Sequence, residues 1–365
     1  MLNKEMTGYI KFFDLDNDLD FHEYLSIWRA GTSRRPHDHP QYMRLMRIDK
    51  QKPRALVYFE DSQPKVLYAF YLIDVFGGEP IDPIEANNKH MVSAYGYGGP
   101  VLVSDIGADF QQFEKLLDDY IAENRIISEF VREDLFGDFK VPRKFSSIKQ
   151  QDNVVINLKK THEELWDCYK HSVRKNIKRA KSSCLEVLFD FDGSLTGEFV
   201  RVYHLTMTRT NAKQSFLIPL EEFEKLNEYF SEDKIGFYAH VMLEGKVVAT
   251  ELILRSPRHI YSFLGGSDMD YSNLRPSDLL KHQVNIWAID NDIGGYVLGG
   301  VVKPYDGIYM FKLAFDEEGA QPFSSQKNIH DNDAYNDMVV ARKTSEQKQG
   351  NPWEPSPDFF PSYFS

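Results

Sequence analysis

Residues 237–265 read FYAHVMLEGKVVATELILRSPRHIYSFLG, and this stretch decides the fold class. Two runs rich in β-branched and aromatic residues, Phe237–Leu243 and Lys246–Arg255, flank the turn pair Glu244-Gly245, which predicts a β-hairpin. A third strand is expected at His259–Gly265. The sequence therefore predicts three consecutive strands that run antiparallel to one another.

The residues after this hairpin add a helix and further strands. Ser277 is expected to cap a helix that runs to Asn291, and Gly295–Leu298 begins the last strands. From Ile308 the chain reads IYMFKLAF, which predicts a strand by its alternation. One face of that strand would carry Tyr309, Phe311 and Leu313, and the other Met310, Lys312 and Ala314. Three antiparallel strands, a helix and a further strand is the order of acyltransferase folds of the GNAT kind.

Both halves of the chain are expected to contain a similar order of strands and helices. In the second half they are a strand at Asn153–Leu158, a helix with the capping box Thr161 and Glu164, a basic helix at Ser172–Ser182, a strand at Leu185–Phe191, and helices at Leu195–Thr208 and Leu220–Tyr229. In the first half they are a hairpin of Arg54–Glu60 and Lys65–Val75, a glycine-punctuated strand at residues 92–105, a helix at Asp109–Asn124 and a strand at Arg125–Phe130. The first half is thus expected to repeat the order of elements of the second half in a shorter form.

The composition is that of a globular protein with 42% hydrophobic and 27% charged residues, and 365 residues favour two domains. The net charge of −12 argues against broad binding to duplex DNA. Cys168 and Cys184 make no metal or redox motif, and the first residues have no signal pattern. No apolar run is long enough to cross a bilayer. We therefore expect a reduced, soluble, cytoplasmic protein.

Five short motifs together resemble the FemAB-like acyltransferases, which include peptidoglycan-bridge aminoacyl transferases and GNAT-family N-acetyltransferases. They are AYGYGGP at 94–100, RKNIKRA at 174–180 followed by CLEV, Met207-Thr208-Arg209, LRPSDLL at 274–280 and DGIYMFKLAF at 306–315. The resemblance covers most of residues 90–340, with the motifs in the expected order.

The resemblance implies an α/β (α+β) fold with two tandem GNAT-like domains and mixed central sheets. We expect these domains at residues 1–150 and 151–345, followed by a tail at 346–365 that is rich in proline and aromatic residues and packs onto the body or onto a neighbour. Members of this group move an acyl or aminoacyl group onto an amine, often on a cell-wall (peptidoglycan) or surface-polysaccharide precursor. They use neither a metal nor a covalent intermediate.

Three residues are candidates for the chemistry of amide formation, which needs a neutral amine and positive groups facing the developing oxyanion. The resemblance makes Lys312 the residue that stabilises the oxyanion or holds a substrate anion. Asp306 could accept or orient the amine's proton, or it could be an ordinary turn residue. Glu251 lies mid-strand and could be a buried general base or the partner of a structural arginine.

Positive and aromatic side chains are candidates for substrate binding. Arg174 and Lys178 lie four residues apart on the basic helix, so that helix is a candidate site for the phosphate of a precursor, a CoA or a tRNA end. Further candidates are Arg209, Arg275, Tyr305, and the glycine-rich segment that contains Tyr95, Tyr97, Gly98 and Gly99. In that segment, backbone N–H groups are expected to meet the substrate.

The acyl donor, an acyl-CoA or an aminoacyl-tRNA, is left open by the sequence. Where GNAT enzymes hold the CoA pyrophosphate on a glycine-rich loop, this chain has Pro276, which lacks an N–H, and Asp278, which puts negative charge at a helix N-terminus. The first alternative is an aminoacyl-tRNA-dependent ligase acting on a peptidoglycan stem peptide. The second is a catalytically inactive tandem GNAT binding module.

Overall fold

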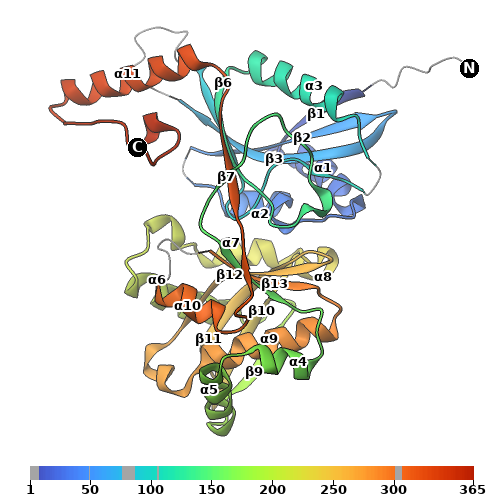
Figure 1. Ribbon diagram of the computed structural model, residues 1–365, viewed down its shortest axis with the longest axis vertical. Coiled ribbons are helices and arrows are strands. Elements are labelled where there is room, and N and C mark those ends of the chain that lie inside the picture. Colours follow the sequence, from blue (N-terminus) through green and yellow to red (C-terminus); the bar gives the residue numbers. More distant parts are fainter. Residues whose placement is uncertain (1–7, 49, 76–86, 105–106, 301–305) are drawn as a thin grey trace, which may run out of the picture. The chain divides into compact units, whose positions relative to one another are not determined.

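The computed structural model describes residues 8–48, 50–75, 87–104, 107–300 and 306–365 (Figure 1). The chain forms two compact units, Met1–Gln150 together with Phe323–Ser365, and Gln151–Pro322. The last segment therefore returns to the first unit. This differs from the predicted domain at 151–345, since residues 323–345 fold with the N-terminal part of the chain.

The first unit is a mixed sheet with helices. Its strands are β1 (Gly8–Asp14), β2 (Lys52–Glu60), β3 (Gln63–Asp74), β4 (Lys89–Ser93), β5 (Val101–Leu102), β6 (Ile126–Arg132), β7 (Ile148–Lys149) and β15 (Ser324–Ile329). Its helices are α1 (Asp18–Ala30), α2 (Pro40–Leu45), α3 (Phe110–Glu123) and α11 (Asn332–Lys348). Among the described residues the strand order is β1-β2-β3-β4-β6-β15-β7, with β5 beside β3, and only β4 and β6 are parallel to each other.

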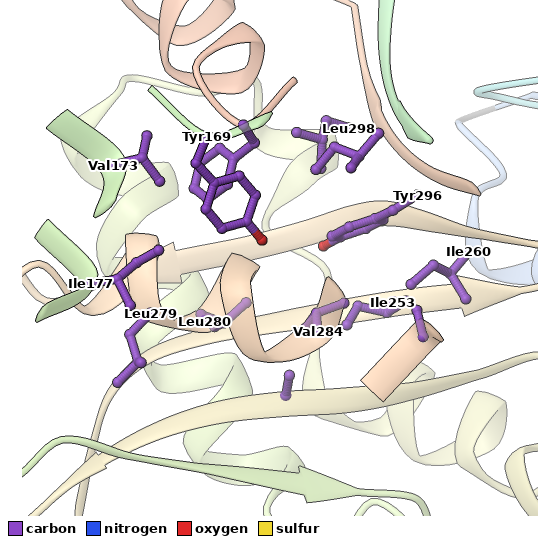
Figure 2. Packing of buried hydrophobic residues seen from close by; sticks show 14 of the residues in the cluster. Tyr169, Val173, Ile177, Ile253, Ile260, Leu279, Leu280, Val284, Tyr296 and Leu298 are labelled. Atoms are coloured by element: carbon purple, nitrogen blue, oxygen red, sulfur yellow. The ribbon is translucent and has the colours of Figure 1, made fainter. Parts of the chain in front are cut away.

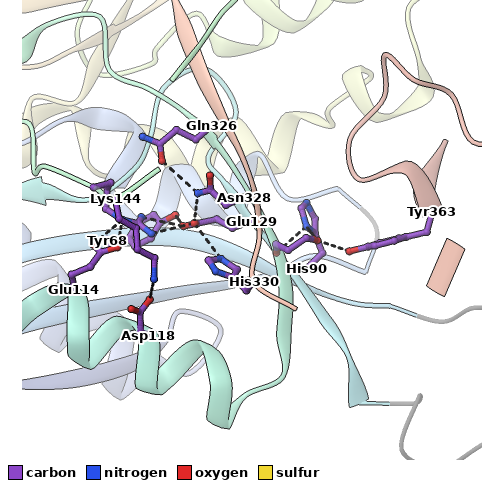
Figure 3. A network of polar contacts seen from close by, with 12 residues as sticks. Tyr68, His90, Glu114, Asp118, Glu129, Lys144, Gln326, Asn328, His330 and Tyr363 are labelled. Carbon is purple, nitrogen blue, oxygen red and sulfur yellow. Dashed lines mark hydrogen bonds and ion pairs between the residues drawn. The ribbon is translucent and has the colours of Figure 1, made fainter. Parts of the chain in front are cut away.

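The returning strand β15 is held in the first unit by a buried polar network around Glu129 of β6 (Figure 3). Asn328 of β15 donates to Glu129 Oε2 at 2.7 Å, and Arg143 Nη2 lies 3.2 Å from the same oxygen. Tyr68 donates to Glu129 Oε1. Burial opposes the ionisation of Glu129, but the charges of Arg143 and His330 outweigh it and hold the pKa of that carboxyl well below its usual range. The Glu129 side chain thus joins strands that are about 200 residues apart in sequence.

The end of the chain packs on the first unit, as its aromatic residues predict. Tyr363 is 3% exposed and shares a hydrogen bond of 2.5 Å with Ser128 of β6. Its ring lies in an apolar cluster with Val75, Ile127 and Tyr335. The predicted tail therefore contributes to the core of this unit, after a helix, α11, that the sequence reading did not identify.

The second unit is also a mixed sheet with helices. Its strands are β8 (Asn153–Asn157), β9 (Glu186–Asp190), β10 (Gly236–Leu243), β11 (Lys246–Arg255), β12 (His259–Ser267), β13 (Gly295–Gly299) and β14 (Ala320–Gln321). Its helices are α4 (His162–Cys168), α5 (His171–Ser182), α6 (Thr196–Arg209), α7 (Leu220–Asn227), α8 (Phe230–Asp233), α9 (Pro276–Asp290) and α10 (Gly307–Leu313). The described strands follow the order β14-β8-β13-β12-β11-β10-β9.

Helix α9 packs its apolar side chains on this sheet, next to α5 (Figure 2). Leu280 and Val284 of α9 and Ile177 of α5 are buried with Ile253 and Tyr296 of the sheet. Burying a side chain of this size contributes about 1.5–3 kcal/mol relative to leaving it exposed. The core therefore fixes α9 over strands β11 to β13. The α/β fold class with two mixed sheets is confirmed.

Candidate functional site

The second sheet splits where β12 leaves β13. The two strands are parallel and pair only from His259 with Gly295 to Tyr261 with Val297, yet β12 continues to Ser267. The register of β12 against β11 also shifts between Leu252 and Ile253, which marks a bulge in this region. Beyond Tyr261 the two strands therefore diverge, and side chains from β11, β12, β13 and α9 meet there.

A buried ion pair lies at this divergence. Glu251 of β11 is 4% exposed, and its Oε1 accepts from Lys281 Nζ at 2.6 Å and from Tyr296 Oη at 2.8 Å. Lys281 Nζ also donates to Ser262 Oγ at 2.8 Å and lies 3.0 Å from Tyr296 Oη. Gly265 stands opposite Glu251 on β12, where a Cβ would come within 2.7 Å of the Thr250 carbonyl oxygen. We call Glu251, Ser262, Lys281 and Tyr296 the strand-divergence site.

The Lys281 ammonium and the Glu251 carboxylate differ in how fully they are hydrogen-bonded. Lys281 Nζ has three oxygens around it, whereas Glu251 Oε2 has no hydrogen-bond partner within the part of the chain that the structure describes. Burial lowers the pKa of Lys281, and the Glu251 carboxylate offsets this only in part. The sequence reading offered an arginine as the structural partner of Glu251; the partner is a lysine.

Lys312 is half-buried and turns its ammonium toward the end of β13. Its Nζ donates to the carbonyl oxygens of Gly300 at 2.8 Å and Gly299 at 3.3 Å. Burial and the nearby charge of Lys281 lower the pKa of Lys312 to about 8, although Glu251 and Asp306 act in the opposite direction. The charges of Lys281 and Glu251 therefore act on the predicted lysine, whose described hydrogen bonds go to the end of β13.

The segment that carries Lys312 is a helix, so the predicted strand from Ile308 is wrong. Asp306 is the N-cap of α10, and its carboxylate accepts from the Tyr309 backbone N–H at 2.8 Å. Over eight residues an apolar alternation does not separate a strand from a helix, and here the capping residue decides. Lys312 lies in the last turn of α10, where a positive charge is favourable.

The start of α9 differs from the prediction by one residue. The helix begins at Pro276, a favourable first position, and Arg275 precedes it in the left-handed region with φ of 64°; Ser277 is not the cap. Asp278 in the first turn is buried and accepts from Asn176 of α5 at 3.1 Å. Burial raises the pKa of Asp278, with Asn176 partly offsetting it. A carboxyl group therefore occupies the N-terminal turn that would otherwise attract an anion.

The basic candidates of the second unit lie on its surface. Arg174 of α5 is half-buried and lies 3.6 Å from Asp167, whereas Lys178 is exposed. Arg209 ends α6 and Arg275 precedes α9, and both are exposed. None of these four has a contact with the strand-divergence site among those described. Tyr305, the remaining candidate of this unit, lies outside the described residues.

The glycine-rich segment of the first unit is largely occupied by internal contacts. The Gly98 N–H donates to the Arg132 carbonyl oxygen at 2.7 Å, and the carbonyls of Gly98 and Gly99 accept from Arg35. Tyr97 is 7% exposed, while Tyr95 is 42% exposed. Gly98 therefore has no free N–H for a substrate, which corrects that part of the prediction. Tyr95 remains open to solvent.

The sequence reading missed Lys281, Ser262 and Tyr296. A signal for Lys281 was present, because α9 carries a stripe of polar residues at three- and four-residue spacing beside its apolar side chains. These are Asp278, Lys281, His282 and Asn285, and all but Lys281 are at most 6% exposed. Ser262 and Tyr296 gave no local signal, since both residue types are common in strands.

The described residues hold no helix both long and apolar enough to cross a bilayer. No three histidine, cysteine or acidic side chains among the described residues are grouped so that they could hold a metal ion.

One family model matches part of the second unit. Residues 169–313 match the acetyltransferase (GNAT) domain family, a range that contains the whole strand-divergence site. No curated protein matches the chain.

Solved structures of low sequence identity share the fold. FemX is 12% identical with a TM-score of 0.61, and the match covers 83% of this chain and 95% of FemX. The C-terminal domain of a putative lysylphosphatidylglycerol synthetase from Agrobacterium fabrum is 11% identical with a TM-score of 0.54, covering 88% and 95%. A conserved protein of unknown function from Bacteroides thetaiotaomicron is 11% identical with a TM-score of 0.55, covering 88% and 100%. The chain therefore shares the fold of FemX, and its residues 169–313 match the acetyltransferase (GNAT) domain family.

Proposed function

We propose that this protein is an N-acyltransferase that moves an acetyl or aminoacyl group onto an amine by direct attack in a ternary complex. The proposal rests on the family match over residues 169–313 and on one observation in particular. Lys312, a half-buried lysine with a pKa of about 8, lies where β13 ends and the sheet splits. A positive charge fixed beside such a split can stabilise the oxyanion that forms when an amine attacks a carbonyl.

The three predicted catalytic residues receive different roles in this proposal. Lys312 is the catalytic residue, because its ammonium would face the developing oxyanion. Asp306 is a positioning residue that caps α10 and so places Lys312. Glu251 is a positioning residue as well, because its carboxylate already neutralises Lys281. The proton of the attacking amine is not assigned to a side chain.

The acceptor in this proposal is an amine of a phosphorylated cell-envelope or surface-polysaccharide precursor, made in the cytoplasm. The exposed cations Lys178, Arg209 and Arg275, together with Arg174, are its proposed phosphate contacts. The buried Tyr97 and the occupied groups of Gly98 and Gly99 have no part in this proposal.

A second form of the proposal, in which the donor is an aminoacyl-tRNA, is favoured by the start of α9. Asp278 puts a carboxyl group in the turn where a CoA pyrophosphate would need free N–H groups and no negative charge. Exposed cations on α5, Lys175, Lys178 and Arg179, offer a surface for a nucleic-acid backbone. One of the structures that share the fold is named as a putative lysylphosphatidylglycerol synthetase, whose named product carries an aminoacyl group.

Transfer of a labelled acyl group to a panel of amines tests both forms. Purified protein is mixed with either acetyl-CoA or aminoacyl-tRNA, each labelled in the acyl group, and with lipid- or nucleotide-linked amino sugars and stem peptides. We expect transfer that falls at least about 100-fold in Lys312→Ala, the size of effect found for loss of an oxyanion-stabilising donor. Lys246→Ala, which removes a lysine paired with Asp268 on the same sheet, should retain the activity. Equal rates in Lys312→Ala and the parent would reject the assignment of Lys312.

A further inference from the structure

The second unit has an open cavity that shares no lining residue with the strand-divergence site. Its volume is about 650 Å³, which is in the range of cavities that hold small molecules. Phenylalanines from the end of β9, from α8 and from the start of β10 line it, namely Phe189, Phe191, Phe230 and Phe237. We call it the aromatic cavity. The proposed acyl transfer makes no use of it.

The rings that line this cavity pack on one another and are still partly open to solvent. Phe191 is 45% exposed, although its ring centroid lies 5.2 Å from that of the buried Phe237 and 5.8 Å from that of Trp287. Phe189 stacks on Phe191 with an angle of 19° between the ring planes. An aromatic guest gains from such rings beyond the area that it buries, because ring faces and ring edges attract each other. The cavity therefore suits a flat aromatic group.

Two cations line the same cavity, Lys234 directly after α8 and Arg255 at the end of β11. Lys234 is exposed, and within the described part of the chain its ammonium has no hydrogen bond or ion pair. The Arg255 guanidinium lies 5.4 Å from the ring centroid of Trp287, so this positive charge is held against the aromatic group. Cations beside an aromatic surface indicate a ligand that carries an anionic group as well as a ring.

The acidic side chains that line the cavity, Asp190 and Asp192, are engaged by the turn after β9. Asp190 is buried and accepts from the backbone N–H groups of Gly193 at 2.7 Å and Leu195 at 2.8 Å. Asp192 is exposed and accepts from the Ser194 N–H at 3.0 Å. Because these carboxylates already accept hydrogen bonds from the backbone, the cations are the charged groups with which a ligand can pair.

We propose that the aromatic cavity binds a small organic anion with an aromatic body, whose ring lies against Phe189 and Phe191 and whose charged group lies at Lys234 and Arg255. The ligand class is defined by a ring and a carboxylate, sulfonate or phosphate in the same molecule. An uncharged aromatic molecule lacks the group that the cations attract, and an inorganic anion lacks the ring. The site is separate from the proposed transfer site, so the inference does not depend on the proposed function.

Dansylglycine, a naphthalene derivative that carries a carboxylate, is a suitable probe. Dansylamide has the same ring system without the carboxylate and is the matched control. The fluorescence of the dansyl group rises in an apolar site, so a titration of the full chain with each probe gives its dissociation constant. We expect saturable binding of dansylglycine and at least about fivefold weaker binding of dansylamide, because the contacts of the carboxylate with the cations are lost.

Variants separate the contribution of the ring from that of the charge. Phe191→Ser should weaken the binding of both probes by about tenfold or more, because it removes an aromatic face. Leu205→Ser changes a similarly exposed apolar side chain on α6, 49% exposed, and should weaken neither. Lys234→Glu should weaken the binding of dansylglycine by about tenfold and leave that of dansylamide unchanged, whereas Lys213→Glu, at an exposed lysine of the same unit, should change neither. If Phe191→Ser does not fold, Lys234→Glu and the comparison of the two probes on the parent chain still decide.

Equal affinity of the parent chain for the two probes would overturn the proposal, since the anionic group would then have no part in recognition. The absence of saturable binding would overturn it as well, as would an affinity for dansylglycine that is unchanged in Phe191→Ser. Phe191→Ser and Lys234→Glu should keep the parent rate of acyl transfer, so the failure of either proposal leaves the other standing.

Discussion

Lys312 illustrates how a single side chain combines position and charge. The sequence pointed to it as one lysine among apolar residues, and the structure gives it two carbonyl partners at the end of β13. Burial and Lys281 together lower its pKa to about 8, so that near pH 7 the ammonium is the main form and above pH 8 the amine is. The charge that the proposed mechanism requires is therefore present at neutral pH and lost in mild alkali.

We predict an alkaline limb in the pH profile of acyl transfer that is centred near pH 8. The ammonium of Lys312 is present below its pKa and disappears as the pH rises through it, so kcat/KM should fall about tenfold per pH unit above 8. Initial rates between pH 6 and 10 measure this, corrected for the titration of the acceptor amine.

Lys312→Arg is the matched control for that profile, because arginine stays charged throughout this range. Its rate should be lower than that of the parent, yet without the limb near pH 8. A limb that is unchanged in Lys312→Arg would assign the titration to another group.

At the scale of elements, α10 shows how a cap can decide a secondary structure. The short segment GIYMFKL has the alternation of a strand, but Asp306 before it satisfies a backbone N–H of the first turn and allows the helix. The helix in turn sets the direction of Lys312, which a strand would have placed elsewhere. Asp306 therefore affects the proposed site through α10.

We predict that Asp306→Asn keeps most of the activity and that Asp306→Ala loses much of it. Asparagine caps helices about as well as aspartate, whereas alanine removes the cap at a cost of about 1 kcal/mol and lets α10 fray. Transfer rates and the NMR signal of Lys312 Cε in both variants measure this. Equal loss in both would instead make the carboxylate itself part of the chemistry.

Another element, β15, depends on a buried charge. Glu129 accepts from Asn328 of β15 and pairs with Arg143, and these contacts fasten the returning strand to β6 (Figure 3). The pKa of Glu129 is held well below its usual range although burial alone would raise it. A group with a lowered folded-state pKa stabilises the fold above the unfolded-state pKa, about 4.3 for glutamate, and the contribution is lost as the pH falls below that value.

We predict that the protection of β6 and β15 against hydrogen exchange weakens as the pH falls from 5 to 3, and that Glu129→Gln reduces both the protection and its dependence on pH. Removing one partner of a buried pair costs about 3–5 kcal/mol, and we expect a smaller cost here because Arg143 keeps its ion pair with Glu114. Exchange rates, corrected for their intrinsic pH dependence, measure this. The exposed Glu123→Gln is the control and should behave as the parent. Full protection in Glu129→Gln would show that the network is not what holds β15.

For the whole molecule, the main feature is that the chain leaves the first unit after Gln150 and returns to it at Phe323. The second unit is one continuous segment whose described strands all lie between Gln151 and Pro322. The first unit is built from two segments. Glu129 and Ser128 of the first segment form hydrogen bonds with Asn328 and Tyr363 of the second.

We predict that a fragment of residues 151–322 folds alone and that a fragment of residues 1–150 does not. The first contains all the described strands of its sheet, whereas the second lacks β15 and leaves Glu129 without Asn328 and His330. Circular dichroism melts should show a cooperative transition for 151–322 and none for 1–150. Joining 323–365 to 1–150 by a short glycine-rich linker should restore the transition. A cooperative melt for 1–150 alone would contradict the prediction.

The sequence by itself determined the order of the central elements and the family resemblance. Long, strongly apolar strands such as Lys246–Arg255 and the capping box of Thr161 and Glu164 carry their structure in local patterns, so the hairpin and the helices around it were predictable. The resemblance in FKLAF also identified Lys312, and the polar stripe of α9 held a signal for Lys281 that was not used.

Only the tertiary structure decided the rest. Strand β15 pairs with β6, and Lys281 pairs with Glu251, so both contacts join residues that are distant in sequence. The point at which β12 stops pairing with β13 is likewise set by the packed sheet. The helical state of α10 was open because a short apolar run fits both periods. These features depend on packing and burial, which act between distant residues and which a local pattern does not contain.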